Sequence, residues 1–227
     1  MKRLTVSVLG LLISIFAFSS NAGTFAYVPN AGSHNVSVID TSNNTVTATV
    51  GVGTDPVGVS VSPDGAKVYV ANAHNNTVSV IRTSDNTVTT VGVGTDPLGV
   101  SVSPDGAKVY VANDGDNTVS VIRTSDNTVT TIGVGNIPKG VSVSPDGAKV
   151  YVANAGGNTV SVIRTSDNTV TTTIGVGSAP YAFGNFIATV TPPTPPASIP
   201  TLSEWAQFIM MLVMIGTVGW YTRRMFR

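Results

Sequence analysis

Apolar and polar residues alternate in short runs along most of this chain, and the runs recur with a fixed period. Within one period, four runs of valine, threonine and serine are separated by turn residues, a pattern that predicts four short strands. Ser62-Pro63-Asp64-Gly65 is a strong turn signal, because proline presets φ and glycine accepts a positive φ. The expected strands are Val57–Ser62, Lys67–Asn72, Thr77–Thr83 and Thr87–Val93.

The four-strand unit occurs three times in succession, as Pro56–Asp96, Pro97–Ile137 and Pro138–Ala179. A four-stranded sheet that is rich in β-branched residues on both faces cannot bury both of them alone. Radial stacking of such sheets against copies of themselves buries both faces, which is the propeller architecture. The sequence therefore predicts an all-β fold, a β-propeller of four-stranded antiparallel blades.

The two ends of the repeat array are incomplete in complementary ways. Phe25–Asp55 supplies the second, third and fourth strands of a unit, and Pro180–Ala188 supplies a lone first strand. We expect these N- and C-terminal strands to complete one blade and to close a ring of four blades. Two alternatives are a homodimer that forms an eight-bladed ring and an open stack with exposed sheet edges.

Four segments divide the chain. Residues 1–22 have a basic start, an apolar stretch and small residues at the end, which predicts a secretory signal peptide. Residues 23–190 hold the repeats, and residues 191–198 are a proline-rich linker. Residues 199–227 contain an apolar run, Ala206–Tyr221, flanked by aromatic residues and terminal arginines, which predicts a transmembrane helix in the inner membrane with the propeller outside.

The repeat carries a family resemblance. The segment SPDGAKVYVAN, followed by NTVSVI and NTVT, resembles the YVTN-type β-propeller repeat of microbial cell-surface proteins, with YVAN at Tyr69, Tyr110 and Tyr151. The resemblance implies a surface-layer-like protein. Members of that family commonly build seven blades, whereas this chain has repeats for four.

The C-terminal tail carries a second resemblance. Ile199, Pro200, Thr201 and Leu202, followed by a short apolar run and a basic end, resemble the IPTL-CTERM sorting signal of Gram-negative bacteria, a relative of PEP-CTERM. This resemblance implies that an exosortase-type transpeptidase cuts near the motif and transfers the protein to the cell surface or extracellular matrix. The alternative is a permanent single-span anchor.

Composition excludes several classes of function. The chain has no cysteine, which excludes thiolate metal sites and thiol nucleophiles. Between residues 23 and 197 there are eleven aspartates against seven lysines and arginines, so this part is mildly acidic. Nucleic acid is therefore not an expected partner, because phosphate binding depends on clustered cations.

The polar residues of the repeat suggest turns rather than chemistry. His34 and His74 occupy what the sequence suggests are corresponding loop positions, where later repeats have Gly115 and Gly156. A calcium loop at Asp114–Asn117 is a weaker interpretation than a polar turn, because the spacing and the distal glutamate of an EF-hand are missing. We expect no catalytic residue, no bound metal and no cofactor.

The expected function is non-enzymatic binding, adhesion or matrix organisation at the cell surface, with a protein or a polysaccharide as ligand. Binding sites concentrate on loops that a rigid scaffold positions, and here the repeats differ most between their second and third strands. The alternatives are a lactonase-like hydrolase or redox propeller, and a structural surface-layer subunit. The candidate binding residues are His74, Asn75, Asp114, Asp116, Asn117 and Gly156.

Overall fold

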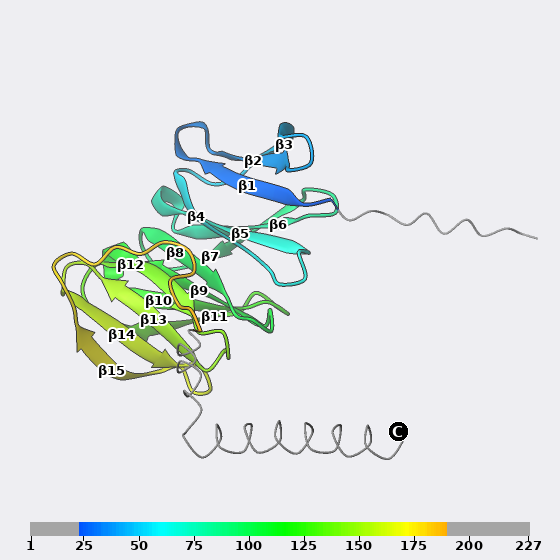
Figure 1. The fold of residues 1–227 in the computed structure, drawn as a ribbon. Coiled ribbons are helices and arrows are strands. Elements are labelled where there is room, and N and C mark those ends of the chain that lie inside the picture. Colours follow the sequence, from blue (N-terminus) through cyan, green and yellow to red (C-terminus); the bar gives the residue numbers. More distant parts are fainter. Residues whose placement is uncertain (1–22, 190–227) are drawn as a thin grey trace, which may run out of the picture. The chain divides into compact units, whose positions relative to one another are not determined.

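The computed structural model describes residues 23–189 of the 227-residue chain, which form fifteen strands in four antiparallel sheets. The sheets follow one another along the chain, and each corresponds to one sequence unit (Figure 1). The first sheet contains β1 (Phe25–Asn30), β2 (Asn35–Asp40) and β3 (Thr45–Gly51). The second contains β4 (Pro56–Val61), β5 (Lys67–Asn72), β6 (Thr77–Arg82) and β7 (Val88–Gly92). The third contains β8 (Pro97–Val102), β9 (Lys108–Asn113), β10 (Thr118–Arg123) and β11 (Val129–Gly133). The fourth contains β12 (Pro138–Val143), β13 (Lys149–Asn154), β14 (Thr159–Arg164) and β15 (Thr169–Gly175).

The predicted strands of the repeat are confirmed, with bounds that differ by no more than one residue from those of β4 to β7. The pattern missed a short 3-10 turn after the second strand of the first three units. These turns are η1 (Ala31–Ser33), η2 (Ala73–Asn75) and η3 (Asp114–Asp116).

Local side-chain bonds fix the turn between the first and second strands. The Ser62 hydroxyl donates to Asp64 Oδ1 at 2.6 Å, and the amide of Ala66 donates to the same oxygen at 3.0 Å. Gly65 has a φ of 70°, a conformation that residues with a Cβ adopt only at a cost. The same bonds recur in the next two units, so the turn chemistry read from the sequence is confirmed.

Apolar packing between neighbouring sheets forms the core. Each inner blade turns one face to the preceding blade and the other to the following blade, and three separate clusters fill the three spaces between the four sheets. In the second blade, Val68 and Ile81 pack toward the first blade, whereas Tyr69 and Val78 pack toward the third. All four side chains are buried. Stacking therefore buries both faces of the inner blades, as the sequence predicted.

Glycines let the first strands of successive blades, called the inner strands here, approach closely. A Cβ added at Gly58 of β4 would lie 1.9 Å from the carbonyl oxygen of Leu98 in β8. A Cβ added at Gly99 of β8 would lie 2.8 Å from the carbonyl oxygen of Lys139 in β12. Only a residue without a side chain allows these backbone contacts, which explains the glycine at this position of the repeat.

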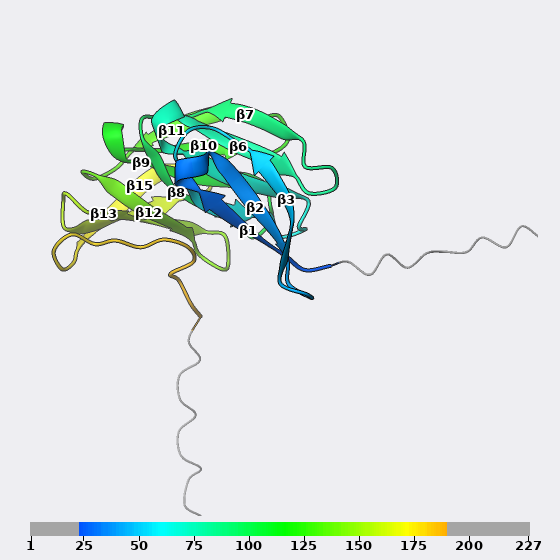
Figure 2. The same ribbon diagram turned by 90° about the horizontal axis from the view of Figure 1, so that it is seen from above.

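The expected closure of the ring is not formed in the described residues. The first sheet has three strands, and residues 180–188 form no strand there. That segment, gold in Figure 1 and Figure 2, instead lies beside β12, where Ser142 Oγ donates to Asn185 Oδ1 at 2.9 Å. There β12 offers the same glycine-lined contact that β4 and β8 offer to the next inner strand, since a Cβ at Gly140 would meet the Ala182 carbonyl oxygen. The segment does not pair with β1 because the chain's own β1 belongs to the sheet at the other end of the stack. Residues 180–188 thus take the inner-strand position of a further blade.

The remaining predicted segments lie outside the described residues. These are the signal peptide at 1–22 and the tail from residue 190, which includes the sorting motif and the apolar run Ala206–Tyr221. Within residues 23–189, no helix has the length and apolar character needed to cross a bilayer.

Candidate binding face

The second-to-third-strand loops lie at the same edge of the blades as the connections from each blade to the next. Strand directions alternate within a blade, which brings these two kinds of loop together. Backbone bonds join them: the amide of Ala73 donates to the Asp55 carbonyl oxygen, and the amide of Asp114 donates to that of Asp96, both at 3.0 Å. We call this edge of the blades the loop face. It holds every candidate binding residue that the sequence analysis named.

An asparagine in the left-handed conformation ends each of these loops in the repeats. Asn76 has a φ of 57°, and its Oδ1 accepts a hydrogen bond from the Asp96 amide at 3.0 Å. In the first blade, His34 takes this place, because it has a φ of 55° and its Nδ1 accepts from the Asp55 amide at 3.3 Å. The structure therefore corrects the assumed correspondence of the two histidines: His34 is equivalent to Asn76, and His74 is equivalent to Gly32.

Most of the candidate loop residues support their own loops. The amide of Thr54 donates to Asn75 Oδ1. Asp116 accepts from the Thr95 amide at 2.9 Å and from the Thr118 hydroxyl at 2.6 Å. Asn117 accepts from the Ile137 amide at 2.8 Å. These side chains hold the loop face in shape, and that role occupies their side-chain oxygens.

His74 and Gly156 differ from the loop-supporting group. The His74 side chain is largely exposed, and its Nδ1 lies 3.6 Å from Asp55 Oδ2, an exposed pair of small energetic value. A Cβ at Gly156 would lie 2.9 Å from Ile137 Cδ1, so the glycine permits close packing. Within residues 23–189 no three metal-ligating side chains come together.

One cluster on the loop face breaks the symmetry of the repeats. Lys139 Nζ donates to Asp114 Oδ2 at 2.5 Å, and both side chains are about four-fifths buried. The same ammonium lies 5.8 Å from the centroid of the Tyr181 ring, and that ring meets Phe183 edge-on at 5.0 Å. Tyr181 is 61% exposed. We call these four residues the Lys139 cluster.

Sequence reasoning named only Asp114 of this cluster. The signal that could have revealed the rest is the lysine at a position where the other repeats have Val57 and Leu98. In the segment after the last repeat, Tyr181 and Phe183 likewise replace two valines of an inner strand, and Phe186 replaces the serine that follows the strand. Both departures from the repeat fall where the last blade meets the following segment.

The carboxylates on the opposite edge of the blades are held as turn acceptors. The Ser103 hydroxyl, with help from the Ala107 amide, lowers the pKa of Asp105 below its usual 3.8. The Thr87 hydroxyl and amide, with a smaller contribution from Arg82, lower the pKa of Asp85 in the same way. A carboxylate with a lowered pKa is a weak base, so these groups are poorly suited to general-base chemistry near neutral pH.

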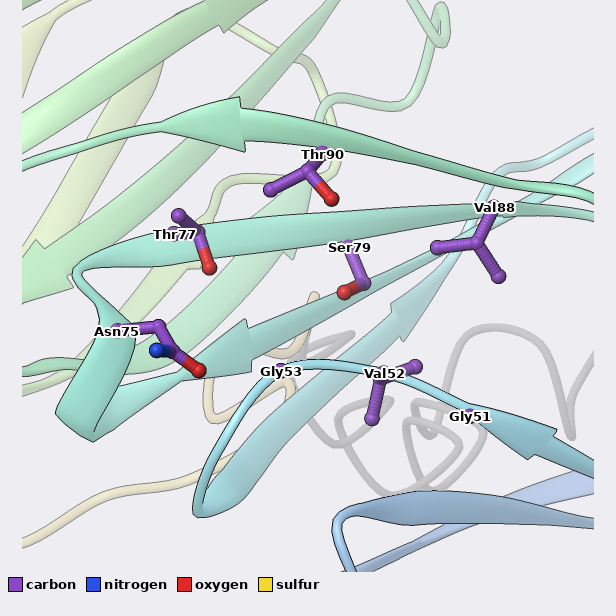
Figure 3. A pocket seen from close by; sticks show the side chains of 8 residues that line it. All are labelled: Gly51, Val52, Gly53, Asn75, Thr77, Ser79, Val88 and Thr90. Carbon is purple, nitrogen blue, oxygen red and sulfur yellow. The ribbon is translucent and has the colours of Figure 1, made fainter.

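The hollows of the described structure lie between blades. One of about 430 Å³ opens beside β6 and is lined by backbone and by small polar side chains such as Thr77, Ser79 and Thr90 (Figure 3). Another of about 510 Å³ lies along the inner strands and is lined by valines, serines and Asn185. Neither is lined by a histidine, a carboxylate or an amine, so neither brings together groups for acid–base catalysis.

Comparison with solved structures supports the β-propeller fold and finds proteins that resemble part of this chain. Hydrazine synthase from Kuenenia stuttgartiensis is 30% identical with a TM-score of 0.63, over 66% of this chain and 45% of that chain. A functionally unknown protein from Desulfotomaculum acetoxidans DSM 771 is 25% identical with a TM-score of 0.53, over 60% and 47%. A catalytically inactive virginiamycin B lyase from Staphylococcus aureus with quinupristin is 14% identical with a TM-score of 0.61, over 70% and 56%, and shows the fold alone.

This chain thus spans about half the length of the solved structures that it matches. Comparison with curated proteins gave no match. Two family models match the chain. The IPTL-CTERM motif matches residues 197–224, and it implies export, processing by an exosortase-type enzyme and a cell-surface destination. The other model matches residues 16–129 and 93–178, more than half of the chain, so the protein belongs to the family described as lactonase, 7-bladed beta-propeller.

Proposed function

We propose that this protein is a non-enzymatic binding protein of the cell surface or extracellular matrix, and that its loop face binds a polysaccharide. The Lys139 cluster is the observation that carries the proposal. It is the place on the loop face where an exposed aromatic ring lies beside a charged donor and acceptor pair. Its position on a rigid stack of blades is typical of binding sites.

The composition of the cluster favours a sugar ligand. The exposed Tyr181 ring is a flat amphipathic surface that offers a large contact area at a low cost in conformational entropy. Phe183 packs against its edge and restricts the ring. The Lys139–Asp114 pair beside the ring has no net charge, which suits a neutral sugar better than a strongly charged ligand.

The route to the surface follows from the tail. We propose that the precursor is held in the inner membrane by its C-terminal apolar run until an exosortase-type enzyme cuts near Ile199, in a Gram-negative bacterium. The surface-layer character and the YVTN-type family remain part of this proposal. A permanently anchored periplasmic scaffold is the alternative, and retention of the tail on the mature protein would favour it.

Binding of the full chain, solubilised in detergent, to polysaccharide prepared from the producing cells' matrix tests the function. Tyr181→Ala should weaken binding by about tenfold or more, which corresponds to the loss of about 1.4 kcal/mol. Lys139→Leu, which restores the residue of the preceding repeat, should also weaken it. His74→Ala is the matched control on the same face and should bind like the parent. Equal binding by all four proteins would refute the site, and no binding by the parent would refute the ligand class.

The family description favours a hydrolase as a second candidate. Against it stand the turn carboxylates, whose lowered pKa values make them weak bases; these include Asp64 and Asp105, which line a hollow of about 190 Å³ together with Lys67. The two larger hollows are lined by small neutral side chains. The decisive assay incubates the full chain with a panel of lactones and follows release of the hydroxy acid. Turnover that disappears in a Lys139→Leu variant would replace the binding proposal with a catalytic one.

A further inference from the structure

The two ends of the blade stack are complementary parts of one blade, three strands at one end and a single segment at the other. The first sheet has a second, third and fourth strand, and within residues 23–189 nothing pairs with the outer edge of β1. At the other end, residues 180–187 lie in the inner-strand position beside β12, and no described sheet continues from them. We propose that two copies of this chain complete each other's end blade. Residues 180–187 of one copy pair with β1 of the other, at two equivalent joints that close an eight-bladed ring.

The repeat fixes the register of the joint. In the second blade Val59 of the inner strand pairs with Val70 of β5, and in the fourth blade Val141 pairs with Val152. The equivalent residues at the chain ends are Phe183 and Val28. Similarly, the amide of Ser62 donates to the Lys67 carbonyl oxygen at 2.8 Å. The residues equivalent to Ser62 and Lys67 at the chain ends are Phe186 and Phe25. The joint therefore brings two pairs of apolar side chains together.

Exposure of these side chains shows what the joint would cover. Val28 is 43% exposed, whereas its equivalents Val70, Val111 and Val152 are all completely buried. Phe25, Phe183 and Phe186 are also exposed, and all three belong to the segments that would pair. An edge strand with exposed apolar residues readily pairs with another chain.

The outer faces of the first and fourth sheets are exposed to solvent, and each is the face that packs against a neighbouring blade elsewhere in the stack. Ile174 of β15 is 44% exposed, whereas its equivalents Val91 and Ile132 are 6% and 8% exposed beneath the following blade. The first blade exposes Val28 on the face that in later blades packs against the preceding blade. Stacking of the fourth blade on the first blade of a second copy would repeat the interface that already joins the third and fourth blades.

A lysine contact between blades points to the same joint. Lys67 Nζ donates to the Thr124 carbonyl oxygen of the next blade at 3.2 Å, and Lys108 Nζ donates to that of Thr165 at 2.7 Å. Lys149 is the third member of the series, and it is exposed at the end of the stack. In the proposed joint its equivalent acceptor is the carbonyl oxygen of Thr41 in the second copy.

A second copy explains the geometry better than closure within one chain. The chain's own β1 belongs to the sheet at one end of the stack, and residues 180–187 lie at the other end (Figure 1). Propellers typically have four to eight blades, so a ring of eight lies within the typical range. Eight blades also differ by only one from the seven of the matched family. A ring of two copies has the cyclic twofold symmetry that is commonest among homo-oligomers.

Disulfide trapping tests the joint directly, because the chain has no cysteine of its own. Since Ser62 and Lys67 are hydrogen-bonded, alternation along the ladder makes the Val59–Val70 pair, and hence Phe183 and Val28, a non-hydrogen-bonded pair. Such pairs have Cα atoms about 4.5 Å apart, within the range that a disulfide spans. The full chain is prepared in detergent as Val28→Cys, as Phe183→Cys and as the double variant, then oxidised mildly and run on a non-reducing gel.

The two single variants, mixed before oxidation and carrying tags of different length, should give one disulfide-linked dimer that contains both tags. Each single variant alone should remain a monomer on the gel. The double variant should give a dimer with two disulfides and no higher species. The molar mass of the unmodified chain in detergent, which requires no substitution, should be that of two copies.

Three results would overturn the proposal. A double variant that oxidises within one chain would show that each ring closes by itself. A ladder of trimers and larger species would show an open chain of copies in place of a closed pair. Thiols that all remain free for alkylation, in variants that unfold at the parent's temperature, would show that residues 180–187 and β1 do not meet. Binding to polysaccharide is measured separately, so its loss or retention leaves this outcome unaffected.

Discussion

Lys108 Nζ donates a hydrogen bond of 2.7 Å to the carbonyl oxygen of Thr165, and this bond ties the third blade to the fourth. The lysine is half-buried at the start of β9. A hydrogen bond between a charged donor and a backbone oxygen contributes more to stability than a neutral one. This hydrogen bond therefore stabilises the packing of neighbouring blades.

Replacing this lysine measures how much the hydrogen bond contributes to stability. Lys108→Met keeps most of the aliphatic stem but removes the donor, and it should lower the free energy of unfolding by about 1–2 kcal/mol. Lys149→Met, the control at the equivalent position of the last blade, should leave the unfolding of a single chain unchanged but weaken the association of two copies. Urea unfolding at low protein concentration and sedimentation at high concentration separate the two effects. Equal loss of stability in both variants would contradict the account.

The close approach of the inner strands predicts a large difference between two glycines of one blade. Gly58→Ala places a Cβ against the Leu98 carbonyl oxygen and should cost about 1–3 kcal/mol or more, because backbone must move. Gly92→Ala meets no atom within 4 Å and should be neutral or stabilising through the reduced entropy of the unfolded chain. Thermal unfolding of the two variants measures this. A Gly58→Ala protein as stable as the parent would mean that the inner strands are farther apart.

The turn aspartates predict loss of stability in acid. The pKa of Asp105 is lowered below 3.8 in the folded protein, chiefly by the Ser103 hydroxyl, and Asp64 and Asp146 are held in the same way. A lowered folded-state pKa stabilises the protein above the unfolded value, and that stabilisation is lost as the pH falls through the folded value. The free energy of unfolding should therefore fall steeply below about pH 4. The triple variant with Asn at these positions should show a shallower fall. An unchanged slope in that variant would mean that other groups control the acid transition.

Tyr110 predicts the behaviour in alkali. Burial, with a smaller contribution from the nearby Asp105 carboxylate, raises the pKa of Tyr110 to about 12. Because the folded value is the higher one, stability is complete below the unfolded value near 10 and is lost as the pH rises toward 12. The Tyr110 hydroxyl is buried and has no hydrogen-bond partner in the described structure, so Tyr110→Phe should be neutral or stabilising at pH 7. The free energy of unfolding of this variant should also change less with pH between 10 and 12. A marked loss of stability at pH 7 would mean that the hydroxyl has a partner.

The strands were predictable because local chemistry determines them. The turn from Ser62 to Lys67 folds through side-chain bonds between residues no more than five positions apart. The left-handed residue that ends each loop was not predicted. His34 was therefore matched with His74, although its structural equivalent is Asn76. A histidine nitrogen accepts the same hydrogen bond as an asparagine oxygen, and sequence alone does not reveal that equivalence.

The closure and the candidate site depend on contacts between distant parts of the chain. Residues 180–187 lie beside β12 without pairing with the chain's own β1, which belongs to the sheet at the other end of the stack, and the sequence of neither segment reveals that separation. Asp114 and Lys139 belong to different repeats, and Tyr181 lies beyond the last one, so no local pattern brings them together. The departures from the repeat were visible in the sequence, but their proximity was not.

The intact mass of the protein recovered from each cell fraction tests the central claim, that this is an exported propeller displayed at the surface. We predict a surface or extracellular form that lacks residues 1–22 and ends near Ile199, as processing at the IPTL-CTERM motif requires. A mature protein that keeps its full tail and is found only in the inner membrane would contradict the account.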